Sequence, residues 1–129
     1  MRLALIQMNL KLGKPEQNIE SVSNLVAKAV QEQPDIIVLP EMWNSSYDLT
    51  NLAKLADKEG EPAAGTMASL AKKYGVNIVA GSISDNRQGK FYNTSYVFDR
   101  QGKTVARYSK IHLFGLMQEG EYGLELTLK

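Results

Sequence analysis

The chain alternates short apolar runs with longer segments in which apolar residues recur every three or four positions. Residues 2–8 and 36–39 are short apolar runs, typical of buried strands. Between them, residues 15–31 place an apolar stripe along one side of a helix. The stripe consists of Ile19, Val22, Val26, Ala29 and Val30. Strand, helix and strand in this order predict two parallel strands joined by a right-handed crossover.

The next part of the chain repeats this pattern. Residues 48–59 are compatible with a further helix, and residues 64–74 form a clearer helical pattern that Gly75 ends. Residues 76–83 return to a short apolar run, which predicts a third strand.

Two later runs predict an antiparallel hairpin. After a turn at 85–89, residues 91–98 and 104–108 flank the tight-turn sequence Asp-Arg-Gln-Gly. Because parallel and antiparallel pairs then share one sheet, the expected fold class is α/β, with a mixed sheet and outer helices. We find no linker or repeat, so residues 1–129 are expected to form a single domain.

Composition excludes several functional classes. The 15 basic and 14 acidic residues are scattered and give a net charge of +1, so no nucleic-acid partner is predicted. The apolar runs are too short to span a membrane or to form a signal peptide, and there is no cysteine, so the cytoplasm is the default location. With no phosphate-binding glycine loop and no cluster at metal-ligand spacing, neither a cofactor nor a metal is predicted.

Two charged residues follow predicted strands, at positions where catalytic residues are common. Glu41 follows the apolar run 36–39, and functional groups of parallel sheets lie at the carboxyl ends of strands. A glutamate there suits a general base if its pKa lies near the working pH. Lys110 follows the last predicted strand, where its ammonium would stabilise an oxyanion. The alternatives are a solvated turn carboxylate and an ordinary surface lysine.

Three segments, 3–9, 34–43 and 108–114, occur in an order that resembles the nitrilase superfamily of carbon-nitrogen hydrolases. The second contains Pro-Glu-Met-Trp and the third Lys-Ile-His-Leu-Phe. The resemblance implies an α-β-β-α sandwich, of which this chain is the N-terminal half. It also implies that Glu41 is the general base, Lys110 the oxyanion stabiliser and a cysteine the nucleophile. Because the chain has no cysteine, the domain is expected to be incomplete and inactive alone.

Other residues carry weaker indications. The resemblance gives Glu119 a supporting catalytic role, against the alternative of a surface carboxylate. Trp43 and Tyr47 line either a substrate pocket or the core. His112 is expected to pack or to bond the backbone and not to act in catalysis. Asn93 begins Asn-Thr-Ser, a common chance match to a glycosylation acceptor that is discounted for a cytoplasmic chain.

The predicted function of the complete protein is hydrolysis of a small amide or nitrile, with the substrate left open. The alternatives are a non-catalytic assembly or binding module, an inactive truncated half-enzyme, and a generic α/β domain. The expected partners are a second copy of the chain, as in dimeric relatives, or a separate C-terminal half that completes the fold.

Overall fold

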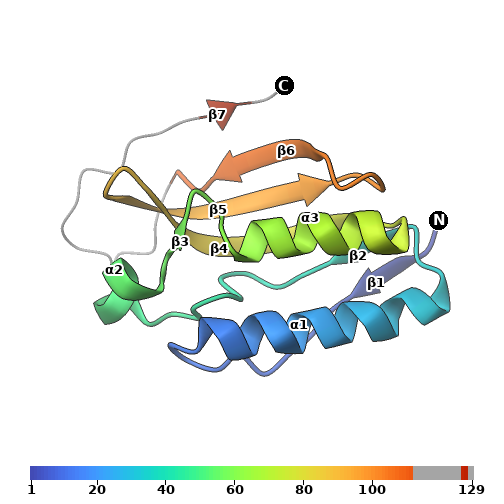
Figure 1. Ribbon diagram of the computed structural model, residues 1–129, viewed down its shortest axis with the longest axis horizontal. Helices are drawn as coiled ribbons and strands as arrows, with labels where there is room; N and C mark the ends of the chain where they lie inside the picture. The colour runs from blue at the N-terminus through green and yellow to red at the C-terminus, as the bar shows by residue number, and fades with distance from the viewer. Residues whose placement is uncertain (112–125, 128–129) are drawn as a thin grey trace.

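The computed structural model describes residues 1–111 and 126–127, whose strands form one sheet in the order β1-β2-β4-β5-β6-β7, with β3 paired to β4 (Figure 1). The strands are β1 (Leu3–Leu5), β2 (Ile36–Val38), β3 (Asp57–Lys58), β4 (Asn77–Arg87), β5 (Lys90–Phe98), β6 (Thr104–Ser109) and β7 (Leu126–Thr127). The helical segments are α1 (Pro15–Ala29), η1 (Val30–Glu32), η2 (Leu49–Asn51), α2 (Leu52–Leu55) and α3 (Ala63–Tyr74).

The sheet is mixed, as the sequence predicted. Strands β1, β2 and β4 are parallel neighbours, whereas β4, β5 and β6 form an antiparallel meander. Both long helices are also confirmed. Pro15 begins α1, and Gly75 ends α3 in the left-handed conformation with φ 61°. No helix of the described residues is long and apolar enough to cross a membrane.

Two local predictions were wrong. The helix expected over 48–59 is limited to η2 and the short α2, and the chain is extended again from Ala56, with ψ 136°. Here Asp57 is buried and its carboxylate accepts the backbone N–H of Ala63, at the start of α3. The turn expected over 85–89 is only two residues, Gln88 and Gly89, both with positive φ. Such a turn matches the twist of the strands, so β4 and β5 pair up to it.

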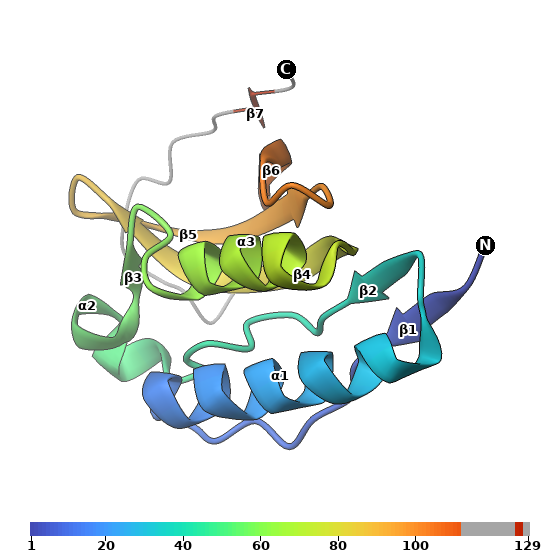
Figure 2. The same cartoon turned by 45° about the vertical axis from the view of Figure 1, so that its right-hand side comes forward.

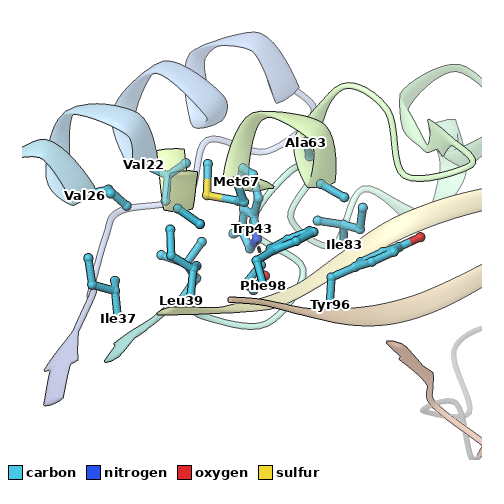
Figure 3. Close-up of a cluster of buried hydrophobic side chains, with 14 of the residues drawn as sticks. Val22, Val26, Ile37, Leu39, Trp43, Ala63, Met67, Ile83, Tyr96 and Phe98 are labelled. Atoms are coloured by element: carbon cyan, nitrogen blue, oxygen red, sulfur yellow. Dashed lines mark hydrogen bonds between the residues drawn. The ribbon is translucent and has the colours of Figure 1, made fainter. Parts of the chain in front are cut away.

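The core lies between the two helices and one face of the sheet (Figures 2 and 3). Ile37, Ile78 and Phe98 lie in register across β2, β4 and β5 and are buried on this face. Val22 of α1 and Met67 of α3 belong to the same buried cluster. Both helices therefore cover the same side of the sheet.

An apolar row crosses the opposite face of the sheet. Leu5, Val38, Val79, Val97 and Ala106 are successive register partners from β1 to β6. Since side chains alternate along a strand, these residues point away from the helices. None of the five is fully buried by the described residues, and Leu5 is mostly exposed.

A bulge in β4 allows the chain beyond β2 to approach closely. The pairing of β4 with β5 shifts between Val79 and Ser82, and Gly81 lies in this bulge with φ 54°. A Cβ atom on Gly81 would overlap with the carbonyl oxygen of Pro40 and would lie 2.6 Å from that of Leu39. Glycine is therefore required by the backbone conformation and by the space.

Replacing Gly81 by alanine should destabilise the fold by at least about 3 kcal/mol, because the left-handed backbone cost adds to a clash with main chain. Gly75→Ala is the matched control, since its φ is also positive, at 61°, but a Cβ there meets no described atom within 4 Å. It should cost about 1 kcal/mol. Urea unfolding followed by circular dichroism measures both, and equal losses would contradict the role of the close approach.

Candidate active site

The turn after β2 points Glu41 outwards and buries the residues that follow it. The backbone N–H of Ser82 donates to the Pro40 carbonyl at 3.2 Å, and the backbone N–H of Trp43 donates to the Ser82 carbonyl at 3.1 Å. Met42 adopts φ 51° between these contacts and is buried. This reversal leaves the Glu41 side chain 47% exposed.

A buried network of polar side chains also holds this turn in place. The Asn44 side chain donates to Asp57 Oδ1 and to the Ser84 carbonyl, both at 3.1 Å, and accepts the Ser84 N–H at 2.9 Å. The Asn18 side chain donates to the Asn44 carbonyl at 2.9 Å. Because a buried polar group without partners is costly, this network fixes the position of the loop.

Lys110 is placed by the ends of the antiparallel strands. Its backbone N–H donates to the Asn93 carbonyl at 2.9 Å, which extends the pairing of β6 with β5 by one residue. The side chain of Arg87 donates to the hydroxyls of Thr94 and Ser109. The last residues of β4 and β6 and the middle of β5 are thereby tied together next to Lys110.

These elements bring Glu41 and Lys110 together, although they are 69 positions apart in the sequence. Lys110 Nζ lies 3.2 Å from Glu41 Oε1 in an ion pair, and the Lys110 side chain is 43% exposed. The same carboxylate oxygen accepts a hydrogen bond of 2.9 Å from Asn93 Nδ2. The structure thus joins the two residues that the sequence singled out and adds Asn93 to them.

The charge state of Glu41 follows from these contacts. Partial burial raises its pKa, but hydrogen bonds from Asn93 and Lys110 lower it more. A hydrogen bond from Tyr47 and the positive charge of Lys110 act in the same direction. The net pKa lies below the ordinary value of 4.5, so Glu41 is ionised at neutral pH. The described residues therefore do not hold this pKa near neutrality, which the sequence argument required of a base.

The two aromatic candidates have different surroundings. Tyr47 is 54% exposed, and partial burial and the nearby carboxylate of Glu41 raise the pKa of its hydroxyl. Trp43 is fully buried, and its indole N–H donates to the Ala80 carbonyl at 2.8 Å (Figure 3). The suggestion that Trp43 lines a substrate pocket is therefore corrected, because its side chain lies in the core and has no free surface.

Two further residues from the sequence argument, Glu119 and His112, lie outside the described residues. Among the described residues, no group of three or more histidine, cysteine or acidic side chains could hold a metal ion. Asn44 and Asn93 were missed as parts of the site. The feature that could have revealed them is a polar side chain within or next to a strand that the hydrophobic pattern assigns to a buried sheet.

The chain has an α/β fold of the nitrilase type, because a solved member of that superfamily superposes on 98% of it. Residues 2–127 match the family described as carbon-nitrogen hydrolase, and the chain therefore belongs to this family. The fold class and the family resemblance inferred from the sequence are both confirmed.

Curated relatives include 2-oxoglutaramate amidase of Bacillus subtilis, 40% identical over 120 residues, which are 93% of this chain and 46% of the relative. The omega-amidase NIT2 of Mus musculus is 33% identical over 93% of this chain and 43% of its own length. A hydrolase in the agr operon of Staphylococcus aureus is 33% identical over 95% of this chain and 47% of its own length. The chain spans about half the length of these relatives.

Solved structures agree with the fold. Nit3 of Saccharomyces cerevisiae, a member of branch 10 of the nitrilase superfamily, superposes with a TM-score of 0.84 and 26% identity. The amidase from Nesterenkonia sp. AN1, with acrylamide added at its active site cysteine, gives a TM-score of 0.81 at 19% identity. Each match covers 98% of this chain and 50% of the other chain.

Replacing Trp43 by phenylalanine should lower the free energy of unfolding by about 2 kcal/mol, because a buried hydrogen bond is lost and a cavity is left. Tyr47→Phe is the control at an exposed position and should change stability by less than about 0.5 kcal/mol. Urea unfolding followed by far-ultraviolet circular dichroism measures both variants. If Trp43→Phe were as mild as Tyr47→Phe, the core assignment of Trp43 would be wrong.

Proposed function

We propose that this chain supplies the base and the lysine of an amidase active site, and that the complete protein hydrolyses a small amide. The observation that carries the proposal is the 3.2 Å contact between Glu41 Oε1 and Lys110 Nζ at the ends of strands. The nucleophile is a cysteine from outside these 129 residues, which contain none. A nitrile substrate is the alternative within the same chemistry.

The proposed reaction runs in two halves. Glu41, as a carboxylate, takes the proton of the cysteine thiol, and the thiolate adds to the carbonyl carbon of the amide. The oxyanion forms beside the ammonium of Lys110, which stabilises it. Ammonia leaves with the proton from Glu41, and an acyl thioester remains. Glu41 then takes a proton from water, whose oxygen attacks the thioester. The carboxylic acid and the cysteine thiolate are released, and the thiolate regains its proton from Glu41.

The relatives favour one substrate class for the complete protein. Two of the three curated relatives named above are described as amidases, and the one at 40% identity is a 2-oxoglutaramate amidase. We therefore propose the terminal amide of a dicarboxylic acid monoamide as the substrate. Glu119 as a supporting carboxylate, Tyr47 as a pocket residue, oligomeric assembly and a cytoplasmic location stay predictions.

A hybrid enzyme tests the proposal, with this chain in place of the matching half of the Bacillus subtilis 2-oxoglutaramate amidase. It should release ammonia from 2-oxoglutaramate, and Glu41→Gln or Lys110→Met should each lower kcat at least about 100-fold. Glu20→Gln and Lys28→Met, both on the exposed surface of α1, are the matched controls and should leave kcat unchanged. A folded, active hybrid whose kcat is unchanged by Glu41→Gln would favour a non-catalytic assembly role for this chain.

The 129 residues alone should show no amide hydrolysis, because covalent acyl transfer has no nucleophile without a cysteine. The assay is ammonia release from 2-oxoglutaramate by the purified chain at high protein concentration. Glu41→Gln controls for contaminating amidases, since a contaminant is unaffected by it. Turnover that disappears with Glu41→Gln would show that this chain acts without a cysteine and would refute the proposed chemistry.

A further inference from the structure

Asn93 differs from the two charged residues that it contacts. Its residue surface is only 7% exposed, whereas the side chains of Glu41 and Lys110 are 47% and 43% exposed. It lies within β5, opposite Ser84 of β4, with hydrogen-bonded strands on both sides. A buried residue in the middle of a sheet has little conformational freedom, while long exposed side chains have much.

This residue contacts both charged partners through different groups. Its side-chain amide donates to Glu41 Oε1 at 2.9 Å, and its backbone carbonyl accepts the N–H of Lys110 at 2.9 Å. The side chain therefore fixes one carboxylate oxygen, and the main chain fixes the origin of the lysine side chain. The carboxylate of the base and the backbone of the lysine are thus both held from a single position in the sheet.

We propose that Asn93 is a positioning residue that holds Glu41 by one oxygen and Lys110 by its backbone, so that the second carboxylate oxygen receives the proton. This inference rests on the proposed amidase function for its catalytic meaning. Its structural part, the control of Glu41 by Asn93, stands on the described contacts.

The chemistry of the amide suits this role. An asparagine donates a hydrogen bond without titrating, so it orients the carboxylate and does not compete for the proton. An aspartate of the same shape would place a second carboxylate against Glu41 Oε1, and two adjacent carboxylates resist simultaneous ionisation. The contact also stabilises the ionised form of Glu41, in agreement with the direction of its pKa.

The first experiment measures the pKa of the Glu41 carboxyl by carbon-detected NMR titration of this chain. Asn93→Ala should raise it by about half a unit, and Asn93→Asp should raise it by more. Asn77→Ala is the matched control. Asn77 is an asparagine of the neighbouring strand β4, and its side chain donates to the backbone carbonyl of Asp35 at 2.9 Å and not to Glu41. A Glu41 pKa that is the same in wild type and in folded Asn93→Ala would overturn the inference.

A second measurement does not depend on how well the Asn93 variants fold. In the wild-type chain, the side-chain amide resonances of Asn93 should shift with pH at the midpoint of the Glu41 titration. In Glu41→Gln, which changes a half-exposed side chain, that titration should vanish. If the Asn93 amide does not titrate in wild type, or if its titration survives Glu41→Gln, the inference is refuted.

The hybrid enzyme links the contact to catalysis. Asn93→Asp should move the acidic limb of the kcat/KM profile to higher pH by the shift seen in the Glu41 titration, with KM nearly unchanged, whereas Asn77→Ala should not move it. A shifted titration with an inactive wild-type hybrid would refute the proposed function and leave the control of Glu41 intact. An active hybrid whose pH profile and Glu41 titration both ignore Asn93 would refute the positioning role and leave the proposed function intact.

Discussion

The close approach of the Pro40 carbonyl to Gly81 is the constraint on which the site depends. Without a side chain at Gly81, the strand bulges and the chain leaving β2 can bond to Ser82. That contact decides which way each following residue points. Trp43 enters the core and donates to the Ala80 carbonyl, and Glu41 faces out beside the ends of the antiparallel strands. One backbone contact thus directs Trp43 into the core, where it stabilises the fold, and leaves Glu41 exposed.

The ion pair at the site forms because the fold brings its two residues together, and it contributes little to the stability of the fold. Exposed pairs such as Glu41 and Lys110 contribute about 0–1 kcal/mol to stability, too little to hold two loops together. The positions of both residues come from buried groups. Asn44 anchors the turn after Glu41 by its polar network, and the strand pairing around Asn93 anchors Lys110. The charged side chains are carried on a rigid frame that is stable without them.

The sequence predicted the mixed sheet and both long helices, because periodicity and strand order determine such features. That Glu41 and Lys110 belong to one site was implied by the family resemblance of their segments and not by periodicity. The sequence could not resolve Trp43, since a turn has no period that tells an inward position from an outward one. The segment 48–59 has helical composition, but the buried carboxylate of Asp57 overrides local propensity. Asn93 was missed because its importance depends on the register between distant strands, which no local pattern reveals.

Because Lys110 follows the last strand of the antiparallel meander, the site can open locally without unfolding of the whole domain. Lys110 reaches Glu41 only while β6 is paired with β5, and the Lys110 N–H forms a bond at the very end of that ladder. Strand ends open with less free energy than a core of packed helices and sheet. Fraying of β6 would separate ammonium from carboxylate while Trp43 and the helices stay in place. Local opening of this one strand would therefore remove the lysine from the site, and a probe of global unfolding would not detect its loss.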